Sequence, residues 1–239
     1  MINKEKTKFM IISRDKRVQD RIGRVLEIGE FKFEVVNEFT YLGSILTSDN
    51  NESVEIKNRI MKANKAYFTL TPILKSKAVT RATKTTIYKT LIRPIITYGG
   101  ECWTLKDVDT SKLACFERKI LRRIFGAKKI GVEEFRRRTN AEIYELYDDA
   151  DIITLVKVSR LRWLGHINRM EDQNPCKMAL YCNIGDKRPR GRPRNRWWNS
   201  VQQDLDKLEV RNWRALSMDR ARWKQILIEA KVLLRTVVP

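Results

Sequence analysis

The sequence lacks long apolar runs and has few cysteines. None of its uninterrupted apolar stretches approaches the ~20 residues that a membrane-spanning helix needs, so we expect no membrane association of that kind. The four cysteines, Cys102, Cys115, Cys176 and Cys182, show no tight repeat, and no charged leader followed by an apolar run opens the chain. These absences predict a protein of a reducing compartment, nuclear or cytoplasmic, that is not secreted.

Acidic side chains are also in short supply. The chain has 29 Asp and Glu against 49 Lys and Arg, which gives a net charge of +20 and a pI near 10.0. This excess predicts a polyanionic partner, and without an apolar anchor nucleic acid is favoured over a lipid surface. At 239 residues and 42% hydrophobic content, the chain can form one large or two small domains with a real core.

The excess charge is concentrated in two segments. Residues 51–126 carry 16 basic and 6 acidic groups and residues 183–239 carry 14 and 6, whereas residues 1–50 and 127–182 are each at +1. A soluble surface usually mixes its charges. The uneven distribution therefore indicates a face or groove that follows a phosphate backbone.

Residues 1–50 predict a small sheet. The runs 8–12, 23–29, 31–36 and 39–46 are short, rich in β-branched and aromatic residues, and separated by charged or glycine-containing breaks, with a hairpin expected at Gly29-Glu30. A sheet of this size is not stable alone, so we expect it to pack on another part.

From Asn51 the apolar pattern takes a helical period. One helix is predicted up to Leu74, a second from near Thr80 with a kink at Pro94, and a third from about Ser111 to Phe125. Cations fall largely outside the apolar stripes. We predict that the following contact nucleic acid: Lys57, Lys62, Lys65, Lys84, Lys89, Arg93, Arg118, Lys119, Arg122 and Arg123.

The third predicted helix repeats like charges four residues apart, Arg118 with Arg122 and Lys119 with Arg123. On an isolated helix each such pair costs roughly 0.2 to 0.5 kcal/mol. A solvated face is one explanation, and an anionic neighbour is the one that the surrounding charge favours.

Further helices are predicted after Gly126, at residues 133–147, 151–170, 196–209 and 217–234. The intervening residues 171–195 contain three prolines and two glycines, which predicts a linker or an ordered loop.

Residues 187–196 have the sequence KRPRGRPRNR. Its arginines alternate with other residues: Arg188, Arg190, Arg192, Arg194 and Arg196. In an extended chain they lie along one edge at roughly 6 to 7 Å intervals, which suits successive phosphates. Phosphate contact by an anchored loop is favoured because an amphipathic helix follows at once. The alternatives are a minor-groove hook, since Arg190-Gly191-Arg192-Pro193 resembles the AT-hook, and a solvated or localisation-like basic run.

Six strings occur together in chain order: NKEKTKFM, EFTYLGSILTSD, IYKTLIRPIITYGGECWTL, CFERKILRRIFG, RLRWLGHINRM and GRPRNRWWNSVQQDL. They resemble the C-terminal part of the reverse transcriptase of non-long-terminal-repeat (LINE, RTE-like) retrotransposons, over nearly the whole chain. The resemblance implies the end of a palm, a helical thumb and a post-thumb region that begin just downstream of the catalytic Tyr-x-Asp-Asp loop. It also implies a chain without catalytic residues, whose Mg²⁺ would belong to the missing palm.

Two local patterns are weaker candidates for chemistry. Tyr147-Asp148-Asp149 offers adjacent carboxylates, but its flanks predict helix ends and no strand-borne third Asp is evident, so we interpret it as a solvated helix terminus. His166, Cys176 and Cys182 do not have the spacing of a zinc knuckle, and His166 is expected to cap a helix or pack beside Trp163.

The sequence therefore predicts a mostly α, α+β chain with four parts. These are a β-rich remnant (1–50), a thumb-like bundle (51–126), a helical connector (127–182), and a basic loop with C-terminal helices (183–239). The expected partners are an RNA template, an RNA:DNA hybrid or target DNA, without metal or cofactor. The rivals are an active reverse transcriptase extending upstream, a host-retained AT-hook-like DNA binder, and a decayed element without function.

Overall fold

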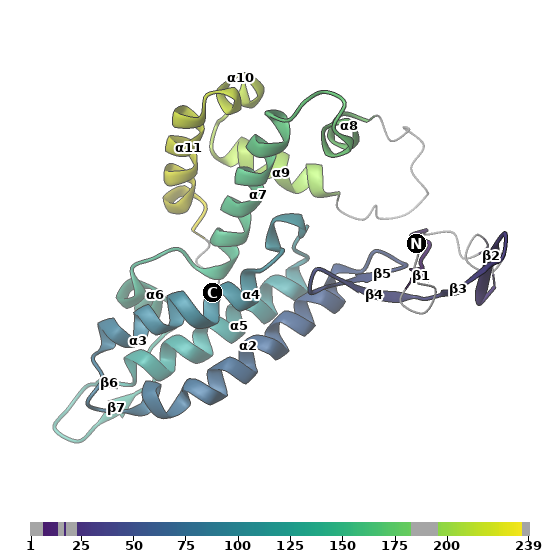
Figure 1. Cartoon of the computed structure of the whole chain (residues 1–239). Helices are drawn as coiled ribbons and strands as arrows, with labels where there is room; N and C mark the ends of the chain where they lie inside the picture. The colour runs from purple at the N-terminus through teal and green to yellow at the C-terminus, as the bar shows by residue number, and fades with distance from the viewer. Residues whose placement is uncertain (1–6, 14–16, 18–22, 183–195, 236–239) are drawn as a thin grey trace. The chain divides into compact units, whose positions relative to one another are not determined.

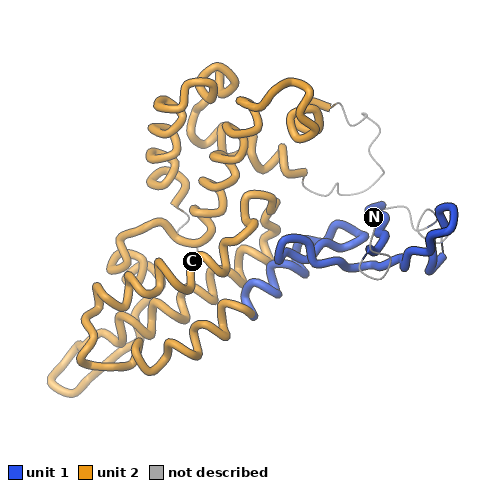
Figure 2. The backbone as a smooth tube through the Cα atoms, in the orientation of Figure 1, with its two compact units in different colours: residues 1–61 blue, residues 62–239 orange. Residues whose placement is uncertain are grey.

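The computed structural model describes residues 7–13, 17, 23–182 and 196–235 (Figure 1). They form two compact units, residues 1–61 and residues 62–239 (Figure 2). The fold is α+β and mostly helical, as predicted. The helix α2 (Glu52–Lys75) begins in the first unit and ends in the second, whereas the sequence placed a boundary before it, at residue 50.

The first unit contains short strands near the predicted runs, but the run predicted at 39–46 is two strands joined by a turn. They are β1 (Lys8–Phe9), β2 (Val25–Ile28), β3 (Phe31–Val35), β4 (Glu38–Tyr41) and β5 (Ser44–Thr47). One sheet has the order β1-β3-β2, with β1 parallel and β2 antiparallel to β3, and β4 pairs with β5 in a separate antiparallel ribbon. The predicted hairpin joins β2 to β3, and Gly29 adopts a φ of +59°, which glycine tolerates without steric cost.

A buried charge pair fastens the β4–β5 ribbon to the first turns of α2. The Glu55 carboxylate accepts a hydrogen bond from the Ile45 N–H at 2.8 Å and pairs with Arg59, one turn along the helix. Arg59 in turn donates to the Gly43 carbonyl at 2.7 Å. Since Arg59 is buried, its charge stabilises this ribbon and does not belong to an exposed basic face.

The second unit is helical apart from one hairpin. After the remainder of α2 come α3 (Arg81–Ile87), η1 (Tyr88–Ile92), α4 (Arg93–Thr97), η2 (Gly100–Cys102), α5 (Asp107–Phe125), β6 (Lys128–Lys129), β7 (Phe135–Arg136), α6 (Asn140–Tyr147), α7 (Ile152–Asn168), α8 (Pro175–Tyr181), α9 (Trp197–Lys207), α10 (Trp213–Met218) and α11 (Arg220–Leu233). α3 and α5 run beside the C-terminal half of α2, and α9, α10 and α11 gather around α7 (Figure 1).

The second predicted helix begins and breaks where the sequence indicates. The Thr80 hydroxyl caps α3 by accepting from the Thr83 N–H at 3.1 Å. Pro94 has no N–H to donate, and the chain before it forms the π-helical turn η1, in which the Arg93 N–H reaches back five residues to the Tyr88 carbonyl. The predicted break is therefore a change of helical register.

Three sequence predictions of secondary structure are wrong in detail. The predicted helix 133–147 begins only at Asn140, after the β6–β7 hairpin, because Thr139 and Glu142 form a capping box there. The predicted loop 171–195 contains α8, which Asn174 caps and Pro175 begins. The predicted helix 217–234 is divided into α10 and α11 at Asp219, which caps α11.

The core of the C-terminal helices is apolar and closely packed. The predicted stripe of α9 contributes Val201 and Leu205, which pack with Leu161 of α7 and Trp223 of α11. The Trp223 indole N–H donates to the Leu161 carbonyl at 3.1 Å. Its ring lies against Gly165, where an added Cβ would be 2.2 Å from the indole nitrogen. Only glycine fits at this crossing of α7 and α11.

We expect Gly165→Ala to destabilise the protein by about 3 kcal/mol, because the indole and one helix must move apart. The matched control is Gly131→Ala, where the nearest atom to an added Cβ is 3.5 Å away, so the change should stay within about 0.5 kcal/mol. Denaturant unfolding measures both. Equal stability of the two variants would contradict the packing of Trp223 on Gly165.

Candidate nucleic-acid interface

Two stretches of the sequence that contribute to the helices of the second unit contain no carboxylate. Between Glu55 and Glu101 there are ten Lys and Arg residues and no Asp or Glu, and between Glu117 and Glu133 there are six and none. α3, most of α2 and the part of α5 that follows Glu117 therefore have no acidic side chain of their own to neutralise their outer faces. Any neutralising group must come from another element or from a ligand.

Along the line where α2 meets α5, cations are held by aromatic rings. The Lys119 ammonium donates to Asn64 Oδ1 at 3.1 Å and lies 4.8 Å from the ring centroids of both Tyr67 and Phe68. One turn along α5, the Arg123 guanidinium donates to the Tyr67 hydroxyl at 3.5 Å. We call these residues, Asn64, Tyr67, Phe68, Lys119 and Arg123, the α2–α5 seam.

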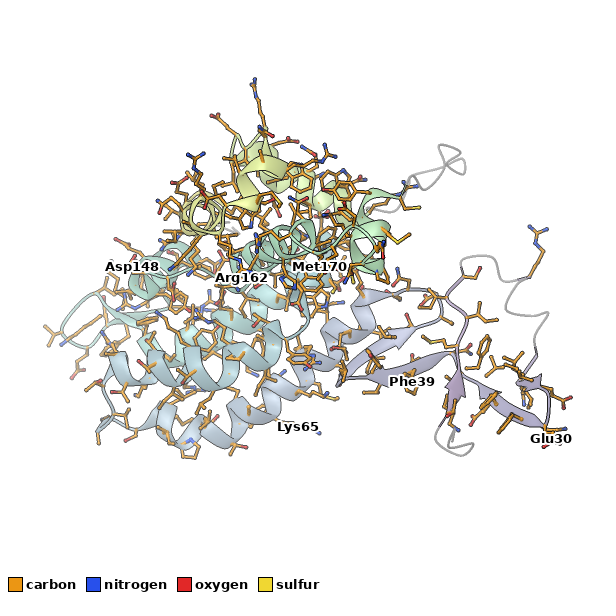
Figure 3. The ribbon with its side chains drawn as sticks, turned by 45° about the horizontal axis from the view of Figure 1, so that its top comes forward. Glu30, Phe39, Lys65, Asp148, Arg162 and Met170 are labelled. Atoms are coloured by element: carbon orange, nitrogen blue, oxygen red, sulfur yellow. The ribbon has the colours of Figure 1, made fainter. Side chains whose placement is uncertain are left out.

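The seam is open to solvent. The Phe68 side chain is 64% exposed, and Lys119 and Arg123 are exposed as well. Lys65 extends outward from α2 (Figure 3), and the predicted contact residues Lys57 and Lys62 are also exposed on that helix. A cation held over ring faces keeps its full charge, unlike one paired with a carboxylate. The seam is thus an exposed group of fixed cations beside a large exposed ring.

Four predicted contact residues are less available than the sequence suggested. Lys84 and Arg118 are buried, each with 8% exposure, because their long apolar stems lie along the helix packing. Lys89 and Arg93 both pair with Asp149, at 2.8 and 3.2 Å. The expected placement of Lys84 and Arg118 on the outer face of their helices is wrong, and a contact of these four residues with nucleic acid stays a prediction.

The other residues predicted to contact nucleic acid are Arg122 of α5 and the five arginines of residues 187–196. Arg122 is half-buried and donates to Asn140 Oδ1 of α6 at 2.6 Å, in the row of α5 next to the one that faces α2. Arg196 is half-buried at the start of α9. The other four, Arg188, Arg190, Arg192 and Arg194, lie outside the described residues.

The start of α9 is fixed to the chain before α5. The Trp197 indole N–H donates to the Glu101 carbonyl at 2.7 Å, and the Ser200 hydroxyl donates to the Thr104 carbonyl at 3.0 Å. Between them, Arg160 donates to the Trp103 carbonyl at 2.9 Å and pairs with Asp204 in the interior. Arg196 therefore enters a helix whose position is determined by buried contacts.

The two weaker candidates behave as structural elements. Asp148 ends α6 in a left-handed conformation with φ of +43° and is exposed (Figure 3), which confirms the helix terminus. The terminus is not solvated throughout, because Tyr147 is buried and Asp149 pairs with Lys89 and Arg93. His166 lies beside Trp163, with ring centroids 5.2 Å apart.

Within the described residues, no three His, Cys, Asp or Glu side chains are grouped to hold a metal ion. No helix in the same part of the chain is long and apolar enough to cross a membrane.

Sequence reasoning missed a buried carboxylate at the centre of this unit. Glu117 of α5 accepts hydrogen bonds from the Tyr88 hydroxyl at 2.7 Å, the Tyr144 hydroxyl at 3.2 Å and the Ile152 N–H at 3.1 Å. Burial raises the pKa of Glu117 to about 7, because desolvation outweighs these hydrogen bonds. Glu117 thus links α5 to η1, α6 and the first residue of α7.

No family model and no solved structure matches this chain. The sequence is similar to an uncharacterised transposon-derived protein of Caenorhabditis elegans, with 25% identity over 200 residues, 80% of this chain and 70% of that protein. The similarity supports a transposon origin, which is the coarser part of the resemblance stated from the sequence.

Glu117→Gln tests the buried carboxylate. In the folded chain its pKa is above the unfolded value, so the folded state binds the proton more tightly and loses stability as pH rises from about 4.5 to about 7. At 1.36 kcal/mol per pKa unit, the loss is on the order of 3 kcal/mol. We expect the free energy of unfolding of the wild type to fall over this window relative to Glu117→Gln, measured by denaturant titration at each pH. Parallel curves for the two proteins would contradict the raised pKa.

Proposed function

We propose that this chain is the nucleic-acid-binding part of a transposon-derived protein, which grips a polynucleotide duplex through the α2–α5 seam. The observation that carries the proposal is the seam itself, where Lys119 and Arg123 are exposed and held by Tyr67, Phe68 and Asn64. The net charge of +20 makes a polyanion the natural partner.

Charge and geometry support a polynucleotide over a small anion at the seam. Binding of phosphates to Lys and Arg releases the counterions condensed on the nucleic acid, and this release drives association. Lys119 is already positioned by three side chains, so little side-chain entropy is lost when it meets a phosphate. The exposed Phe68 ring beside it can contact a sugar or stack on an unpaired base.

The resemblance to non-long-terminal-repeat reverse transcriptases defines the finer form of the proposal. By that resemblance the duplex is an RNA template paired with its DNA copy, α2 and α5 belong to a thumb, and Arg188 to Arg196 contact template RNA or target DNA. The similarity to a transposon-derived protein supports the transposon origin from which this assignment starts. The proposal gives this chain no polymerase chemistry, no metal and no cofactor of its own.

The double variant Lys119→Gln/Arg123→Gln tests the seam. Its control is Lys224→Gln/Lys231→Gln, which removes the same charge from two exposed positions of α11. Binding to an RNA:DNA hybrid, single-stranded RNA and an A/T duplex is measured across a salt series. If roughly 6 to 10 phosphates are neutralised, the wild-type log-log slope is on the order of minus 5 to minus 9.

We expect the seam variant to weaken binding and reduce this slope by about 2, since each lost phosphate contact contributes about 0.9. The α11 control should change the slope much less. Equal slopes for the two variants would contradict the seam as the interface, and salt-insensitive binding to all three ligands would contradict polynucleotide binding. Preference for the A/T duplex over the hybrid would favour the AT-hook-like alternative.

A further inference from the structure

A cation is held between aromatic rings where α8 and α10 meet. The guanidinium carbon of Arg214 lies 5.5 Å from the ring centroid of Tyr181, the last residue of α8, and 5.2 Å from that of Trp213. The Trp213 ring lies in turn 5.5 Å from the ring of Trp198, near the start of α9. We call these four residues, Tyr181, Trp198, Trp213 and Arg214, the Arg214 cluster.

A buried amide fixes two members of the cluster. Asn168, the last residue of α7, is only 5% exposed. Its Oδ1 atom accepts a hydrogen bond from the Tyr181 hydroxyl at 2.6 Å, and its Nδ2 atom donates to the Arg214 carbonyl at 3.0 Å. The same Nδ2 atom donates to the Ser217 hydroxyl at 2.7 Å. The ring and the backbone that position the guanidinium are therefore already ordered, so a ligand has little side-chain entropy to remove.

Two members of the cluster reach solvent. Arg214 is exposed and Tyr181 is 43% exposed, whereas Trp213 is buried in the core of the C-terminal helices. Among the described residues, no carboxylate pairs with Arg214. A guanidinium that contacts ring faces keeps its charge, and its N–H groups, which lie at the edge of the plane, remain for an acceptor.

The cluster combines residues from both sides of the basic segment. Tyr181 precedes the segment in sequence and Trp198 follows it, and between them lie six Lys and Arg residues, from Lys187 to Arg196. α10 contacts both, through Arg214 and Trp213. The charge of this part of the sequence favours a polyanion as the ligand of an exposed guanidinium placed here.

The exposed ring selects among polyanions. In a duplex the bases are paired and stacked on one another, so their faces are covered. An unpaired base instead offers its face to an aromatic side chain or a guanidinium plane. Phosphate oxygens accept from the edge of a guanidinium in the geometry that arginine binds best. A ring beside a guanidinium, as at Tyr181 and Arg214, therefore fits an unpaired nucleotide better than a base pair.

We propose that the Arg214 cluster binds an unpaired nucleotide of a single strand, with Arg214 on a phosphate and Tyr181 against the base. The inference rests on the proposed function for its class of ligand, a polynucleotide, and adds a second site to it. The cluster shares no element and no residue with the α2–α5 seam. The seam thus meets a duplex, and the cluster meets a strand that is not paired.

Binding of a short oligothymidylate across a salt series tests the phosphate contact. We expect Arg214→Gln to reduce the log-log slope by about 0.7, the value for one phosphate of a single strand. The matched control is Arg211→Gln, which removes the same charge from an exposed position between α9 and α10. Its slope should change much less. Equal slopes for the two variants would overturn the assignment of Arg214 to a phosphate.

Two variants of Tyr181 test the base contact. Tyr181→Leu removes the ring and should weaken binding of the oligothymidylate roughly fivefold or more, the effect of losing one stacked base, without changing the salt slope. Tyr181→Phe keeps the ring and should bind as the wild type does. An oligomer with the same phosphates but without bases should bind the wild type and Tyr181→Leu equally. If Tyr181→Leu weakens both oligomers alike, or neither, the stacking is wrong.

The seam variant Lys119→Gln/Arg123→Gln separates this inference from the proposed function. It should lose affinity for the RNA:DNA hybrid and retain the effect of the bases on binding of the oligothymidylate. Hybrid binding that depends on the seam, together with single-strand binding that is indifferent to Arg214 and Tyr181, would overturn the inference alone. The reverse result would contradict the proposed function alone. An acidic peptide that depends on both residues as strongly as the oligothymidylate does would overturn the choice of a nucleotide.

Discussion

The helix α5 carries more positive charge than its own sequence can neutralise, and its packing divides that charge. Successive residues of a helix are turned by about 100°, so Arg118 and Arg122 form one row and Lys119 and Arg123 the next. The first row faces α6 and the second faces α2. The second row is exposed and is held by uncharged side chains of α2, and the proposed binding site at the seam follows from this arrangement.

A second constraint fixes the basic C-terminal region to the same unit. The segment Glu101–Thr104, at the end of η2, offers its carbonyl groups to Trp197, Arg160 and Ser200, which come from α9 and α7. The pairing of Arg160 with Asp204 is buried, so loss of either partner would leave an uncompensated charge in the interior. Arg196 therefore directly precedes a helix, α9, that is joined by these contacts to α7 and to the segment before α5.

Long helices were predictable from apolar periodicity, and short elements were not. The stripes of α5 and α9 indicated both their position and their buried face. The β6–β7 hairpin was missed because its strands have two residues each and carry Lys128, Lys129 and Arg136, which have no strand preference. α8 was missed because Pro175 suggested a loop, although proline also suits the first position of a helix.

The seam was predictable only in part, because the sequence gives the charge of a helix but not its partners. Lys119 and Arg123 were expected at a nucleic-acid surface, whereas Tyr67 and Phe68, which hold Lys119, were not. Asp149 neutralises Lys89 and Arg93 from more than fifty positions away, and this pairing depends on tertiary packing. The stretches of α2 and α5 without carboxylates were the sequence signal for the seam. They indicate which Lys and Arg side chains cannot pair with a carboxylate of their own helix.

The most direct measurement is site-specific photo-crosslinking to an RNA:DNA hybrid. A photoreactive phenylalanine analogue is placed at Phe68 in the seam and, as a reference, at Ile228 on the exposed side of α11. The account predicts that the probe at position 68 crosslinks to the hybrid in a yield that falls with added salt, while the probe at position 228 crosslinks little. Equal yields at the two positions, or a yield at 68 that salt does not change, would contradict the seam as the place where this chain meets a polynucleotide.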